Sequence, residues 1–237
     1  MVGVNMNKLL TILLTAMLFI ASSAYADTFD DAVKAHETGD YKQAIKLLKP
    51  LALNGDAQAQ YNLGVTYYNG QGVAQDYVEA IRWHKLAAAQ GYANAQDNLG
   101  DMYSNGQGVA QDYVEAIRWH KLAAAQGHAQ AQASLGFMYY AGKGVAQDYV
   151  EAVKWFKLAA AQGHAVTQIN LGASYSNGQG VVQDYVSAHM WFNLAAITGD
   201  KNAVQKRDIV AKQMTQQQIA EAQKLARECL ARKYKGC

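Results

Sequence analysis

Two of the six histidines occupy positions from which they could share a metal ion. His84 and His120 both lie in the segment YVEAIRWHKLAAAQG, which occurs twice in the chain. Paired imidazoles are common ligands of zinc and copper. The next two copies of the segment, however, carry Phe156 and Phe192 at this position. A position that accepts phenylalanine is a packing position, so we expect no metal site and no cofactor here.

Other motifs for catalysis or metal binding are incomplete. His36-Glu37 begins like a zinc-protease motif, but Asp40 stands where the second histidine is required. Gly70-x-Gly72 follows a helical pattern and not a strand, so it does not predict a dinucleotide-binding loop. The chain contains no Ser-x-x-Lys, Lys-Thr-Gly or Gly-x-Ser-x-Gly. No buried polar constellation is identifiable, and we expect no catalytic residues and no enzyme activity.

The sequence segments that carry these residues repeat with a period of 36 residues. Leu63-Gly64, Tyr67 and Trp83 recur at this interval in four copies. A fixed period between about 20 and 50 residues indicates a repeat array, in which each unit packs on its neighbours.

Each copy contains two helical patterns. In the first copy Leu63 and Tyr67 share one face of a helix that ends at a glycine-rich loop. The second helix begins at Asp76, whose carboxylate can accept from the exposed amides of the first turn. His128 and His164 follow the glycines that end this helix in later copies, and they are interpreted as loop residues.

The ends of the chain differ from the repeats. A lysine, a short apolar run and an Ala-x-Ala site predict a secretory signal peptide, with either Met1 or Met6 as the start. Thr215 and Gln218 form a capping-box pattern that opens a charged helix near the other end. The predicted segments are 1–26, signal peptide; 27–56, N-terminal cap and partial repeat; 57–92, 93–128, 129–164 and 165–200, four repeats; and 201–237, C-terminal capping helices with a basic tail.

The order Leu-Gly-x-x-Tyr, Gly-x-Gly-Val, Ala-x-x-Trp and Leu-Ala-Ala-x-Gln-Gly resembles the Sel1-like repeat family, which is related to tetratricopeptide repeats. The resemblance covers residues 40–200. It implies an all-α, right-handed α-solenoid of stacked helix-turn-helix repeats whose first helices line a concave surface. It also implies an adaptor that binds other proteins. Several secreted bacterial members act in the cell envelope, so we expect a periplasmic protein, with extracellular export as the alternative.

The copies differ mainly in their first helices, at three positions spaced by four and three residues. This spacing places the positions on one helix face. We predict that the face binds a protein partner, an envelope protein or an extended peptide, with Tyr68, Phe137 and Tyr140 as exposed aromatic anchors. Neutral variation on a solvated face is the alternative. The predicted face consists of Tyr61, Val65, Tyr68, Asp97, Asp101, Ser104, Ala133, Phe137, Tyr140, Ile169, Ala173 and Ser176.

Charge separates the repeats from the tail. Residues 27–200 carry 11 basic and 16 acidic side chains, whereas 201–237 carry 9 and 3. This balance does not favour nucleic acid as a partner. Contact of the tail with anionic lipid is an alternative function, although a solvated cap is the preferred interpretation.

Cys229 and Cys237 are the only cysteines. Outside the cytosol we expect an intramolecular disulfide between them, and an intermolecular bridge and the oligomeric state stay open. β-Lactamase or penicillin-binding activity, as proposed for cysteine-rich relatives, is the enzymatic alternative. Those relatives carry paired cysteines within their repeats, which this chain lacks.

Overall fold

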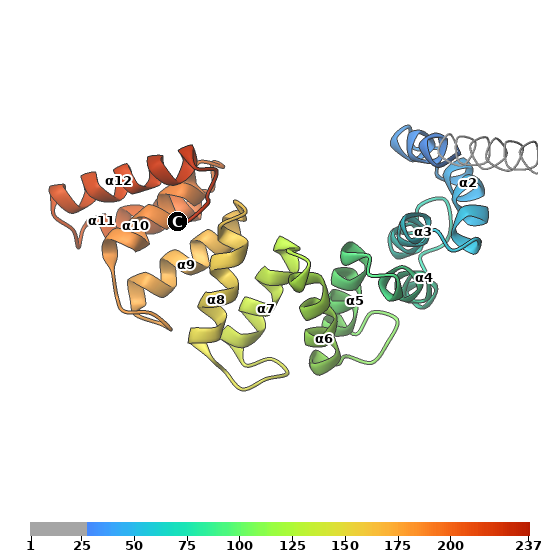
Figure 1. The fold of residues 1–237 in the computed structure, drawn as a ribbon, viewed down its shortest axis with the longest axis horizontal. Helices are drawn as coiled ribbons and strands as arrows, with labels where there is room; N and C mark the ends of the chain where they lie inside the picture. The colour runs from blue at the N-terminus through green and yellow to red at the C-terminus, as the bar shows by residue number, and fades with distance from the viewer. Residues whose placement is uncertain (1–27) are drawn as a thin grey trace, which may run out of the picture. The chain divides into compact units, whose positions relative to one another are not determined.

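The computed structural model describes residues 28–237, and every helix or strand in that part of the chain is an α-helix (Figure 1). The predicted signal peptide lies outside the described residues. The described chain forms two compact units, divided in the sequence between Ala95 and Gln96.

The helices repeat in pairs. The first helices of the four full repeats begin 36 residues apart, and so do the second helices, which confirms the predicted α-solenoid of helix-turn-helix repeats. A helix over residues 28–37 and α2 (Tyr41–Leu53) precede them. The repeats are α3 (Ala57–Asn69) and α4 (Tyr77–Ala89), α5 (Ala93–Asn105) and α6 (Tyr113–Ala125), α7 (Ala129–Ala141) and α8 (Tyr149–Ala160), and α9 (Ala165–Asn177) and α10 (Tyr185–Ala196), followed by α11 (Lys201–Ala211) and α12 (Gln216–Ala231).

One loop geometry joins the two helices of every full repeat. Gly70 follows α3 in the left-handed conformation (φ 68°), which glycine adopts without strain. The Gln75 side chain donates to the Tyr68 carbonyl at 2.8 Å and closes the loop. Asp76 then caps α4, as predicted, by accepting two backbone N–H groups at 3.0 Å. The glutamine contact recurs at Gln111, Gln147 and Gln183.

The glycine inside each first helix makes room for an aromatic ring of the second helix. A Cβ atom added to Gly64 would lie 2.5 Å from the ring of His84, which is closer than real Cβ contacts. This explains why a residue that costs about 1 kcal/mol of helix propensity relative to alanine recurs in all four repeats. The rings are His84, His120, Phe156 and Phe192, and all four are buried.

Two glutamines tie successive helix pairs together. Gln90 Nε2 donates to Gln60 Oε1 at 2.9 Å, and Gln60 Nε2 donates to the Ala52 carbonyl at 3.0 Å. The buried amide therefore has a partner at both ends, as buried polar groups require. The second unit repeats this chain of hydrogen bonds at Gln162, Gln132 and Ala124.

Helix α12 closes the core of the second unit. Thr215 and Gln218 form the predicted capping box at its start. The helix lies along α10 (Figure 1), where Ala226 joins Trp191 and Leu194 in one buried cluster. Terminal repeats that present a polar outer face in this way are typical of solenoids.

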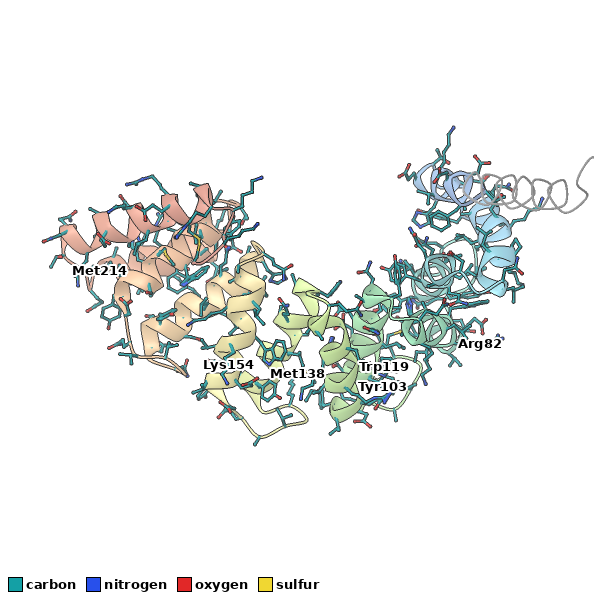
Figure 2. All side chains as sticks on the ribbon, in the orientation of Figure 1. Arg82, Tyr103, Trp119, Met138, Lys154 and Met214 are labelled. Atoms are coloured by element: carbon teal, nitrogen blue, oxygen red, sulfur yellow. A yellow bond between two sulfur atoms is a disulfide. The ribbon has the colours of Figure 1, made fainter. Side chains whose placement is uncertain are left out.

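A disulfide joins Cys229 to Cys237, with their Cα atoms 5.6 Å apart (Figure 2). Cys229 belongs to α12 and is fully buried, whereas Cys237 is exposed. The bond holds the last residues of the chain against the end of this helix.

Candidate protein-binding surface

The predicted binding face occupies three positions of the first helices, and burial differs between them. At the first position Asp97, Ala133 and Ile169 expose only 4%, 8% and 7% of their surface. Tyr61 is half-buried. The prediction that this position lies free of the core was therefore wrong.

The first position packs against the ring of the second helix in the same repeat. In the first repeat the rings of Tyr61 and His84 lie 5.6 Å apart between centroids. In the second repeat Asp97 Oδ1 lies 2.9 Å from His120 Nδ1. Variation at this position thus changes the partner of a buried ring, which is a packing constraint that the sequence comparison did not reveal.

The second and third positions reach the surface to different degrees. Phe137 is 49% exposed, as predicted. Tyr68 and Tyr140 are half-buried, because their rings pack against Tyr77 and Tyr149 at 5.2 and 5.1 Å between centroids. The expectation that these two tyrosines are exposed anchors was wrong. The remaining members of the two positions are all half-buried: Val65, Asp101, Ser104, Ala173 and Ser176.

A cavity of about 430 Å³ opens on α5, α6, α7 and α9. Met138, which is labelled in Figure 2, is one of its lining residues. This volume falls within the range of about 300–1,000 Å³ that is usual for ligand pockets. Its lining combines a carboxylate, an ammonium group, two imidazoles, the rings of a tyrosine and a phenylalanine, and several hydroxyl and amide groups. We call it the Asp101 pocket; its lining includes Asp101, Ser104, Tyr113, Phe137, Lys143 and Asn170.

A buried histidine–aspartate cluster lies at the edge of the Asp101 pocket, although no buried polar constellation was expected. His120 Nδ1 lies 2.9 Å from Asp97 Oδ1, and His120 Nε2 lies 3.7 Å from Asp101 Oδ1. His128 Nδ1 lies 3.5 Å from the other oxygen of Asp97. The signal in the sequence was the pair of aspartates in the second repeat, at positions that are uncharged in every other repeat.

The contacts of the two histidines assign their protons. His128 Nδ1 accepts the Ala131 N–H at 3.3 Å, so neutral His128 carries its proton on Nε2. The carboxylate of Asp97 therefore receives its hydrogen bond from His120 Nδ1.

Burial raises the pKa of Asp101, and the negative charge of Asp97 raises it further, while His120 and His128 offset part of the effect. Half of the Asp101 side chain is nevertheless exposed. Among residues 28–237, no group of three or more histidine, cysteine or acidic side chains is placed to hold a metal ion. The histidine–aspartate cluster contains groups that can bind protons, and its Asp101 carboxylate lines the pocket.

His84, in the first repeat, occupies the position equivalent to His120 but has no carboxylates beside it. Helices α4 and α6 have identical sequences, but Tyr61 and Val65 stand where the second repeat has Asp97 and Asp101. His84 is fully buried, and burial lowers its pKa to about 4. This histidine is therefore neutral at pH 7.

His128 and His164 lie in the loops just before α7 and α9, as predicted from the sequence, and each caps the helix that follows. Each ring accepts a backbone N–H with Nδ1 and serves as the N-cap of its helix, α7 or α9. Asp56 and Asp200 do the same for α3 and α11. Burial lowers the pKa of His164, which favours the neutral ring that an accepting cap requires.

The basic tail is exposed on α12 and after it. Lys224 forms one long ion pair with Glu228, at 3.9 Å, and such surface pairs contribute little to stability. None of the helices in the described part of the chain combines the length and the apolar character that crossing a membrane demands. The exposed basic residues are Lys224, Arg227, Arg232, Lys233 and Lys235.

Comparison with known proteins identifies the repeat. The Sel1 repeat family model matches five consecutive segments, residues 33–56, 57–92, 93–128, 129–164 and 165–200. A search of curated proteins found no match.

Two solved structures share the fold at 30% identity or more. One is a protective antigen present in uropathogenic Escherichia coli strains that displays an SLR fold, with 32% identity over 90% of this chain and a TM-score of 0.78. This chain spans about half of that structure, 47% of its length. The other is a Sel1 repeat protein from Oxalobacter formigenes, with 30% identity, a TM-score of 0.68 and coverage of 85% of this chain and 75% of that one. The chain belongs to the Sel1 repeat family.

Proposed function

We propose that the protein is a non-catalytic scaffold of the bacterial cell envelope, which binds a partner protein on the exposed part of its first helices. Sel1 repeat proteins are generally protein-interaction scaffolds. A signal peptide predicted from residues 1–26 supports export across the inner membrane, with the periplasm as the place of action.

The observation that carries the proposal is the exposure of Phe137 beside the Asp101 pocket. A half-exposed aromatic ring at the rim of a concave site is the kind of residue that dominates interface energetics. Partly exposed Asp101, Ser104 and Asn170 surround it and can supply the polar contacts of an interface.

This surface is smaller than the twelve-residue face predicted from the sequence. It retains the exposed or half-exposed members of α5, α7 and α9: Asp101, Ser104, Phe137, Tyr140, Ala173 and Ser176. Tyr140 contributes less than expected because its hydroxyl already donates to Gln179, at 3.2 Å.

The test is a pull-down from the envelope fraction of the native host with three baits: the mature chain, Phe137→Glu and Leu122→Glu. Leu122 is the matched control, because it is 44% exposed on a second helix, close to the 49% of Phe137. The proposal predicts a protein that the mature chain and Leu122→Glu retain and Phe137→Glu loses, with equal helicity by circular dichroism. Retention by Phe137→Glu together with loss by Leu122→Glu would assign binding to the second helices and contradict the proposal.

A further inference from the structure

The rim of the Asp101 pocket already holds one ammonium group between two aromatic rings. Lys143 Nζ lies 5.3 Å from the ring centroid of Tyr113 and 5.3 Å from that of Phe137. Both distances are within the range of about 6 Å over which a cation is attracted to an aromatic face. The lysine comes from the loop after α7, so its side chain can leave this position without disturbing a helix.

Asp101 gives the same pocket a carboxylate that has no lysine or arginine partner among residues 28–237. Within the described chain, no lysine or arginine forms an ion pair with it within 4.0 Å, and its nearest basic group is His120 Nε2 at 3.7 Å. Burial and the charge of Asp97 disfavour its ionised form. A cation that entered the pocket would favour the ionised form of Asp101 and so counteract both effects.

The fold itself does not require the two carboxylates. The first repeat folds around an identical second helix with Tyr61 and Val65 in their place. Placing two negative charges within a partly buried cluster is unfavourable unless they are paired or used. Asp97 is paired with His120 and His128. Asp101 has no such short pair, and its presence in the second repeat alone, at the wall of a cavity, is therefore better explained by a ligand than by packing.

We propose that the Asp101 pocket binds a basic side chain, arginine or lysine, of the partner protein. The charged group lies against the Asp101 carboxylate and takes the place of Lys143 between Tyr113 and Phe137, and the aliphatic stem lies along the exposed ring of Phe137. The net negative charge of residues 27–200 attracts such a partner. This inference rests on the proposed function and specifies the chemistry of the partner.

Lys143 decides between a cationic and an anionic ligand. If the pocket binds a cation, Lys143 is a competitor and its removal strengthens binding. If the pocket instead binds a carboxylate, Lys143 is the group that recognises it and its removal weakens binding. With a cationic ligand, Asp101→Asn therefore weakens binding and Lys143→Gln strengthens it, whereas with an anionic ligand both effects have the opposite sign.

The test is an NMR titration of the mature ¹⁵N-labelled chain with N-acetyl-arginine methylamide. The acetyl-norleucine and acetyl-glutamate methylamides serve as neutral and acidic controls. The arginine probe should shift the amide signals of Ser104, Phe137 and Lys143. Asp101→Asn should weaken its binding by about fivefold or more, and Lys143→Gln should strengthen it by about two- to fivefold. Val65→Ala, at the equivalent position of the first repeat, should leave binding unchanged.

Absence of any shift with the arginine probe overturns the inference, as does equal binding of the norleucine probe or a weaker affinity in Lys143→Gln. The pull-down reports separately on the proposed function. If the Phe137→Glu bait loses its partner while the arginine probe does not bind, the scaffold function stands and the inference falls. If the probe binds but Phe137→Glu keeps its partner, the pocket stands and the proposed interface falls.

Discussion

His120 Nδ1 lies 2.9 Å from Asp97 Oδ1 in a buried site, whereas His84, at the same position of an identical helix, faces Tyr61. One second-helix sequence thus accommodates a charged and an uncharged partner for its buried ring. The two repeats form a matched pair within one chain, and their comparison separates what the fold needs from what the second repeat adds.

His84 should make the protein less stable in acid. Its pKa is about 4 in the folded chain and about 6.5 when unfolded, so between these values the unfolded state binds more protons. Stability is complete above pH 6.5 and falls as the pH drops, by about 2 kcal/mol at pH 5. His84→Phe, which introduces the residue found in the third and fourth repeats, should remove this part of the slope. Chemical denaturation of both proteins at pH 7.5 and pH 5 checks it, and parallel losses of stability would show that His84 is not responsible.

Asp101 should have the opposite effect to His84 on the pH dependence of stability: it should make the protein less stable as the pH rises. Because its pKa is raised in the folded chain, the folded state binds more protons than the unfolded state above the usual pKa of an aspartate. Its contribution to stability therefore declines as the pH rises through that window. Asp101→Asn should be more stable than the parent at pH 7 and equal to it near pH 3. A variant that is less stable at pH 7 would mean that the ionised carboxylate is already favourably paired.

Replacing the glycine of a first helix should be destabilising only while the aromatic ring of the second helix packs against it. A Cβ atom at Gly172 would meet ring atoms of Phe192 at 2.8 Å. Gly172→Ala should therefore destabilise the chain by about 1–3 kcal/mol despite its better helix propensity. In a Phe192→Ala background, the same change should stabilise by about 1 kcal/mol. The free energies of unfolding of the four proteins measure the coupling, and additive effects would exclude the steric explanation.

The disulfide should stabilise the C-terminal cap. Cys229 and Cys237 are eight residues apart, and the loss of a bridge that closes so short a loop costs about 2–3 kcal/mol in the chain-entropy account. Cys237→Ser removes the bond at its exposed end and leaves no cavity at Cys229. The thermal unfolding midpoint is measured with and without reductant. Reductant should lower the midpoint of the parent protein to that of the variant. An unchanged midpoint on reduction would show that the cap does not depend on the bond.

The repeat register, the Asp76 cap and the Thr215 capping box could be predicted because each depends on residues close in sequence or on a fixed period. The exposure of individual positions could not. Spacings of four and three place residues on one helix face, but they do not say which neighbouring helix covers that face. Asp97 and Tyr68 were assigned to the surface for this reason, although one meets His120 and the other packs on a tyrosine ring.

The Asp101 pocket could not be read from the sequence because it is built from several repeats. Its lining comes from α5, α6, α7 and α9 and from the loop that carries Lys143. A single copy contains neither the rings nor the two charges together. Comparison of paired positions across the copies, Asp97 with His120 and Tyr61 with His84, was the available signal for the charged cluster.

The most direct test of the scaffold account is photo-crosslinking in the native host, with a photoreactive residue in place of Phe137 or, as the matched control, Leu122. The account predicts a discrete protein adduct from position 137 and none from position 122, and Asp101→Asn should reduce the yield at position 137. An adduct from position 122 with none from position 137 would contradict it.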